Sequence, residues 1–87
     1  MIYGHFKDYQ PVGECKIYQR GNLIYHGQLM NTRRNNHGKE YENGKLIYDG
    51  YFMDDVRNGT GCLYLNDGKQ VYCNYVHGCL KGFVEKP

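Results

Sequence analysis

The 87-residue sequence contains no serine and no tryptophan, and it has only two prolines. The absence of serine excludes a serine nucleophile. The first ten residues include no apolar run flanked by basic residues, and no later run is long enough for a spanning helix. We therefore expect a cytoplasmic protein. In that compartment cysteines are normally reduced, so we expect four free thiols: Cys15, Cys62, Cys73 and Cys79.

The charge is nearly balanced, with 11 basic and 9 acidic residues and a net charge of +2. Because the two signs are interspersed, the sequence gives no indication of a nucleic-acid partner. No apolar period of 3.6 residues is sustained, which predicts almost no helix. What the chain does have is ten tyrosines and twelve glycines, residues typical of half-buried strands and tight turns.

A Tyr/Gly pattern recurs along the chain at a nearly constant interval. Each copy has an aromatic or aliphatic residue, then any residue, then Gly, any residue and an apolar residue. The copies start at Ile2, Tyr25, Tyr48 and Tyr72, which gives spacings of 23, 23 and 24 residues. The fourth copy has Asn74 in place of its Gly. We therefore divide a single domain, residues 1–87, into copies at about 2–24, 25–47 and 48–71 and a partial copy at 72–85.

A second set of tyrosines recurs in phase and predicts hairpins. Tyr18, Tyr41 and Tyr64 are each followed by a turn signal, such as Asn43-Gly44, and Asn-Gly favours a type I′ turn. We expect the extra residue of the third copy to lie in its turn. The predicted strands are 2–7, 14–19, 23–30, 37–42, 45–53, 60–65, 69–76 and 82–85. Longer polar loops are predicted at 8–13, 31–36, 54–59 and 77–81. The predicted fold is all-β, an antiparallel meander of stacked β-hairpins that forms a twisted or curled single-layer sheet.

These columns resemble MORN repeats, whose pattern is Tyr-x-Gly-x-aromatic, then Gly-x-Gly, an aromatic residue and a Gly turn. The third copy matches best, at Tyr48, Gly50, Phe52, Gly59, Gly61, Tyr64 and Gly68. The stretch 40–50 is also similar to the MORN variant common in bacterial proteins. The resemblance implies a non-catalytic interaction or scaffold module. It also implies two alternatives, a membrane-associated module and an antitoxin or immunity-like protein.

Alternation along the strands places one apolar column on one sheet face. We expect this face to bind a protein partner through Phe6, Tyr25, Leu29, Tyr48, Phe52 and Tyr72. A single-layer sheet cannot cover both of its faces, and exposed aromatic surface marks interaction sites. The same residues could instead form only the core of a curled sheet, and both roles can coexist. Self-association as a homodimer is also expected to be feasible, because the outer strands carry few charges.

The segment 31–39 is the one basic cluster of the sequence. Arg33, Arg34 and Lys39 are candidates for contact with phosphate or anionic lipid head groups, which would make the chain a membrane-associated adaptor. Two adjacent arginines fall short of the four to eight basic residues typical of lipid-binding clusters. A solvated hairpin loop is the favoured interpretation.

Nothing in the sequence favours catalysis or a cofactor. Asp54-Asp55 is the only adjacent acidic pair, and it lies in a predicted loop. Cys73, His77 and Cys79 lie close together but match no zinc-site spacing. We therefore expect no catalytic residue, no metal and no cofactor.

Overall fold

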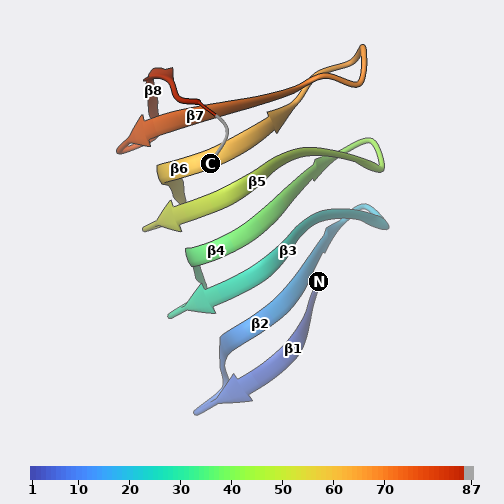
Figure 1. The fold of residues 1–87 in the computed structure, drawn as a ribbon. Coiled ribbons are helices and arrows are strands. Elements are labelled where there is room, and N and C mark those ends of the chain that lie inside the picture. Colours follow the sequence, from blue (N-terminus) through green and yellow to red (C-terminus); the bar gives the residue numbers. More distant parts are fainter. Residues whose placement is uncertain (86–87) are drawn as a thin grey trace.

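The computed structural model describes residues 1–85 as one antiparallel sheet of eight strands that follow each other in chain order (Figure 1). No helix occurs among these residues, and the predicted all-β meander is confirmed. The sheet is twisted and does not close on itself, so β1 and β8 are its outer strands. The strands are β1 (Ile2–Lys7), β2 (Gln10–Gln19), β3 (Asn22–Met30), β4 (Arg33–Glu42), β5 (Lys45–Met53), β6 (Val56–Tyr64), β7 (Gln70–Val76) and β8 (Cys79–Phe83).

The turns at one end of the sheet follow the sequence prediction. Asn43 and Gly44 join β4 to β5, and their φ angles of 51° and 79° are both positive, as a type I′ turn requires. Arg20 and Gly21 join β2 to β3 with the same signs. The β6–β7 connection, residues 65–69, is longer.

The loops predicted at the other end are wrong, because each is a two-residue turn between longer strands. These turns are Asp8-Tyr9, Asn31-Thr32, Asp54-Asp55 and His77-Gly78, and all eight residues have positive φ. The pairing register shifts beside each turn, for example between Gly50 and Phe52. Such β-bulges interrupt the alternation of side chains, so the sequence there resembles a loop although the backbone stays paired.

The pairing repeats with a constant period of 23 residues. Opposite Cys15, Gly38 and Gly61 stand Gly27, Gly50 and Cys73 respectively. The 24-residue step to Tyr72 is therefore not structural, and the third turn contains no inserted residue relative to this period. Val71 holds the position of Tyr48, and Tyr72 holds that of Asp49, because they face Leu63 and Cys62 as Tyr48 and Asp49 do.

One face of the sheet forms the core of the chain, here called the core face. Its buried residues are Cys15, Tyr25, Leu29, Tyr48, Phe52, Cys73 and Tyr75. The ring of Tyr48 lies over Gly61 of the next strand, where an added Cβ would come within 2.4 Å of the ring. Tyr25 lies over Gly38 in the same way. Glycine is required at these two positions because the aromatic ring occupies the place of its missing side chain.

Candidate binding surfaces

The six residues expected to form an aromatic binding face do not share one accessible surface. Tyr25, Leu29, Tyr48 and Phe52 are buried in the core face. Their rings pack edge to face across strands, with centroids 5.3 Å apart for Tyr25 and Phe52. Phe6 is exposed on β1, and Tyr72 lies on the opposite face, where it pairs with Cys62 rather than taking the position of Tyr48.

Two arginines cover the rings of the core face. The guanidinium of Arg34 lies 5.3 Å from the centre of the Phe52 ring, and that of Arg57 lies 4.4 Å from the centre of the Tyr48 ring. These distances are in the range of cation–π contacts. Burial behind these contacts raises the pKa of Tyr48 and of Tyr25 to about 12. The core face is thus closed by the chain itself.

Arg34 is also held by Asp55. Its Nε atom lies 3.0 Å from Asp55 Oδ1, and its Nη2 donates a hydrogen bond of 2.7 Å to the backbone carbonyl of Asp55. Burial alone would raise the pKa of Asp55, but hydrogen bonds from the backbone N–H and the side chain of Arg34 outweigh it and lower that pKa. Arg34 is therefore a structural cation between two hairpins.

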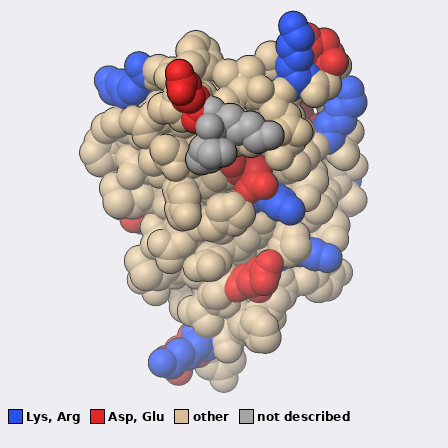
Figure 2. Space-filling model, viewed as in Figure 1, with Lys and Arg blue, Asp and Glu red and all other residues tan. Residues whose placement is uncertain are grey.

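The other two residues of the basic cluster do not join Arg34. Arg33 lies 3.8 Å from Asp54. Lys39 belongs to strand β4, where it stands between His26 and Asp49 on the face opposite the core. In the view of Figure 2, basic and acidic side chains are scattered, and several lie side by side. The three residues thus lie in a paired strand, in different surroundings, and not in a loop.

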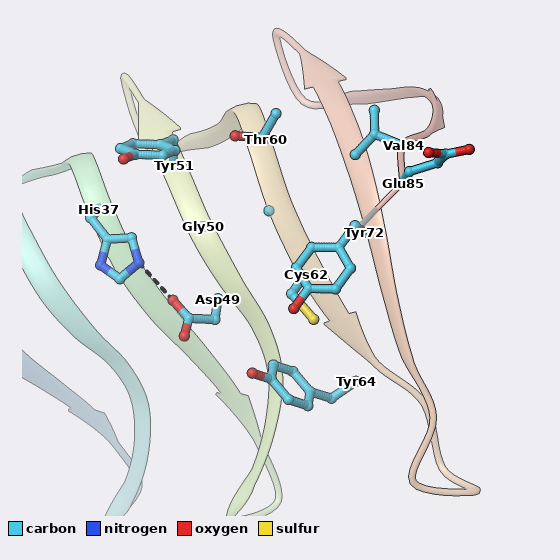
Figure 3. Close-up of a pocket in the computed structure, with 11 residues that line it drawn as sticks. His37, Asp49, Gly50, Tyr51, Thr60, Cys62, Tyr64, Tyr72, Val84 and Glu85 are labelled. Carbon is cyan, nitrogen blue, oxygen red and sulfur yellow. Dashed lines mark ion pairs between the residues drawn. The ribbon is translucent and has the colours of Figure 1, made fainter. Parts of the chain in front are cut away.

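The face opposite the core, here called the open face, carries an accessible pocket. A central row of residues crosses this face from strand to strand: Lys16, His26, Lys39, Asp49, Cys62 and Tyr72. A pocket of about 450 Å³ lies over its C-terminal half. Figure 3 shows the labelled side chains around it, with His37 and Asp49 on one side and Tyr72 on the other.

Tyrosines and carboxylates define the chemistry of this pocket. Tyr51, Tyr64 and Tyr72 line it, and Glu85 lies at its rim. Burial, together with the nearby Cys62 and Asp49, raises the pKa of Tyr64, so its hydroxyl stays neutral at physiological pH. Tyrosine offers both apolar area and a hydrogen-bonding tip, which suits a recognition surface.

An ion pair lies beside the tyrosines. Asp49 Oδ1 is buried without a hydrogen bond of good geometry, and His37 Nε2 lies 2.7 Å from it. The His37 ring also packs edge to face on Tyr51, with centroids 5.7 Å apart. The earlier hairpin holds a related pair, His26 and Glu14, at 3.3 Å. The pocket therefore has a polar wall with its own fixed charges.

The cysteines do not assemble into a site. Cys15, Cys62 and Cys73 are buried, whereas Cys79 is exposed. The thiol of Cys73 donates a long hydrogen bond of 3.5 Å to the carbonyl of Gly61, and burial raises its pKa. Within residues 1–85 no three His, Cys, Asp or Glu side chains are grouped so as to hold a metal ion.

Sequence reasoning missed the residues of the pocket, although one signal for them exists. Tyr51 occupies the unspecified position between Gly50 and Phe52 in the repeat. Because alternate residues of a strand point to opposite faces, a tyrosine there belongs to the face opposite Phe52. Asp49 and Tyr72 share this face for the same reason, once the period of 23 residues is known.

Comparison with known proteins leaves the family open. Neither the protein-family models nor the curated proteins searched include a match to this chain. None of the described residues forms a helix of the length and apolarity needed to span a membrane.

Proposed function

We propose that the chain is a non-catalytic interaction module that binds a protein partner through its open face. The observation that carries this proposal is the pocket lined by Tyr51, Tyr64 and Tyr72. The core face is filled by the chain's own rings and arginines. The open face is the one that leaves an aromatic hollow accessible, and exposed aromatic surface of this kind typically marks interaction sites.

The form of the pocket suits a side chain presented by a partner. Its volume of about 450 Å³ falls in the range of ligand pockets, which take one or a few bulky groups. Asp49 and Glu85 add carboxylates to its wall and rim. A partner segment with an apolar or aromatic side chain beside a hydrogen-bond donor would complement both features.

The Tyr/Gly repeat supports the same proposal. Its pattern resembles MORN repeats, and the eight-strand meander agrees with the fold that this resemblance implies. Arrays of this kind present extended surfaces built from equivalent positions, which suits scaffold proteins. The structure adds that the equivalent positions for binding are the residues between the conserved columns.

Affinity capture with matched variants tests the proposal. The tagged chain is used to capture proteins from extracts of its source cells, and the retained proteins are quantified by mass spectrometry. We expect at least one protein to be retained by the wild type and lost with Tyr51→Ala or Tyr72→Ala. Tyr9→Ala is the control, because Tyr9 is fully exposed in the β1–β2 turn. A retention profile identical for all variants would refute a role for this face.

A further inference from the structure

The outer strand β1 exposes an apolar side chain at a position that interior hairpins bury. Phe6, Leu29, Phe52 and Tyr75 hold equivalent positions, opposite Pro11, Arg34, Arg57 and Leu80 respectively. Leu29, Phe52 and Tyr75 are 3%, 3% and 7% exposed, whereas Phe6 is 55% exposed. The difference lies in the neighbours, because all four residues are large and apolar.

The contacts of Phe52 show what Phe6 lacks. The ring of Phe52 on β5 packs against Tyr25, which belongs to the second strand before it, with centroids 5.3 Å apart. Arg34, on the intervening strand β4, lies over both rings. Since β1 is an outer strand of the described sheet, Phe6 has no earlier strands to supply these two contacts.

The other outer strand, β8, carries side chains that match this deficit. Leu80 holds the position of Arg34 and Arg57, because it stands opposite Tyr75 as Arg57 stands opposite Phe52. Arg57 lies over one ring on each side, Tyr48 and Tyr75. Leu80 has a neighbouring strand on one side only and is 46% exposed. An apolar residue at this position suits an apolar neighbour on the open side.

We propose that β8 of one copy of this chain pairs antiparallel with β1 of a second copy, so that the sheet and its repeat continue across the junction. Leu80 of the first copy then packs on Phe6 of the second, as Arg57 packs on Tyr75 within the chain. The backbone groups along the two outer edges, which have no partner strand within the described sheet, form the connecting hydrogen bonds.

The period of the repeat fixes the register of this junction. Phe83 stands opposite Cys73 as Gly61 stands opposite Gly50, and Gly4 stands opposite Cys15 as Gly27 stands opposite Gly38. Within the chain, Gly61 pairs with Cys73 across the next interface. Phe83 of one copy therefore faces Gly4 of the other. Phe83 is 68% exposed in the single chain, and at the junction it meets a residue without a side chain.

This arrangement makes the association head to tail. Two different surfaces meet, so each added copy leaves the same two surfaces free, and open oligomers grow instead of a closed symmetric dimer. Strands β1 and β8 each contain one lysine, Lys7 and Lys81, and no acidic residue. Salt should therefore not weaken the junction, since no attraction between opposite charges holds it.

Sedimentation velocity over a range of concentrations tests the proposal. A junction of two short strands is small, so association is expected up to about 1 mM protein, the range of weak interfaces. The wild type should show a sedimentation coefficient that rises with concentration beyond that of a dimer. Phe6→Lys and Leu80→Lys should each abolish the rise, because each places a charge in the apolar junction. Met30→Lys is the matched control: Met30 is 54% exposed at the end of an interior strand, and this variant should associate like the wild type.

Mixing the two edge variants separates this junction from the alternatives. Phe6→Lys keeps an intact β8 edge and Leu80→Lys keeps an intact β1 edge, so an equimolar mixture should form dimers and nothing larger. Circular dichroism verifies that each variant is folded, and Phe83→Lys replaces Leu80→Lys if the latter is not. A monomeric wild type at every concentration would overturn the proposal. So would a single edge variant that associates like the wild type, or a mixture that stays monomeric.

Discussion

At the scale of single residues, the core depends on an exchange of volume between paired positions. Tyr48 lies over Gly61, and Tyr25 lies over Gly38. Where the chain has Val71 in the tyrosine position, Phe83 stands in the glycine position. The large residue and the small one have changed places, so the total volume is roughly kept. Volume-conserving changes of this kind are the ones that protein interiors tolerate best.

A glycine substitution tests this exchange. We expect Gly61→Ala to lower the free energy of unfolding by about 1–3 kcal/mol, the usual cost of overpacking, because the new methyl group would meet the Tyr48 ring. Urea denaturation measures the change. Gly82→Ala is the control, since an added Cβ there meets nothing within 4 Å. Combining Gly61→Ala with Tyr48→Leu should cost less than the sum of the two changes, and simple additivity would contradict the argument.

At the scale of strands and turns, the sequence predicted every strand but misplaced the ends of several. Asn43-Gly44 was recognised because its turn type has a strong signal. Asp54-Asp55 was not, since two aspartates with positive φ are uncommon and the adjacent bulge breaks the alternation. Tyr72 was assigned to the wrong face because a tyrosine 24 residues after Tyr48 resembled the pattern, whereas backbone pairing keeps the period at 23. The pocket was missed for a related reason, because its walls come from positions that the repeat leaves unspecified.

One arginine ties four neighbouring strands together, and its removal is a test at this scale. Arg57 on β6 donates a hydrogen bond of 3.0 Å to Glu40 on β4 and one of 2.7 Å to the Tyr75 hydroxyl on β7, and its guanidinium covers Tyr48 on β5. Arg57→Ala should lower the free energy of unfolding by about 2 kcal/mol, since it leaves Glu40 mostly buried without its cation.

An exposed arginine provides the comparison in the same denaturation experiment. Arg33 lies 3.8 Å from Asp54, and both side chains are more than half exposed. Arg33→Ala should change the free energy of unfolding by less than about 0.5 kcal/mol, as is usual for surface pairs. Equal losses for the two variants would show that Arg57 is not a tie between strands.

At the scale of the whole molecule, the sheet has no closed core, and its stability is concentrated in the middle. Strands pair only with their neighbours in sequence, and the ring contacts join β3 to β5 and β5 to β7. The described residues form an elongated body of 40 × 25 × 20 Å. Proteins built from such units unfold from their ends, because a terminal unit has one neighbour instead of two.

Hydrogen exchange followed by mass spectrometry should show this gradient. In dilute solution we expect peptides from β3 to β6 to exchange slowest and those from β1 and β8 to exchange fastest, because local opening costs least at the ends. At high concentration the two outer strands should gain protection if copies join head to tail. Uniform protection across all eight strands in dilute solution would contradict a stability concentrated in the middle.

The pairing of each tyrosine with a glycine in the next strand also bears on how such a chain can change over generations. Because the partner always lies at the same interval, duplication or loss of a whole hairpin gives every surviving tyrosine a suitable glycine. Insertion of a single residue within a hairpin would move the rings away from the glycines and onto residues that have side chains. Descent should therefore vary the number of hairpins freely while conserving the spacing within each one.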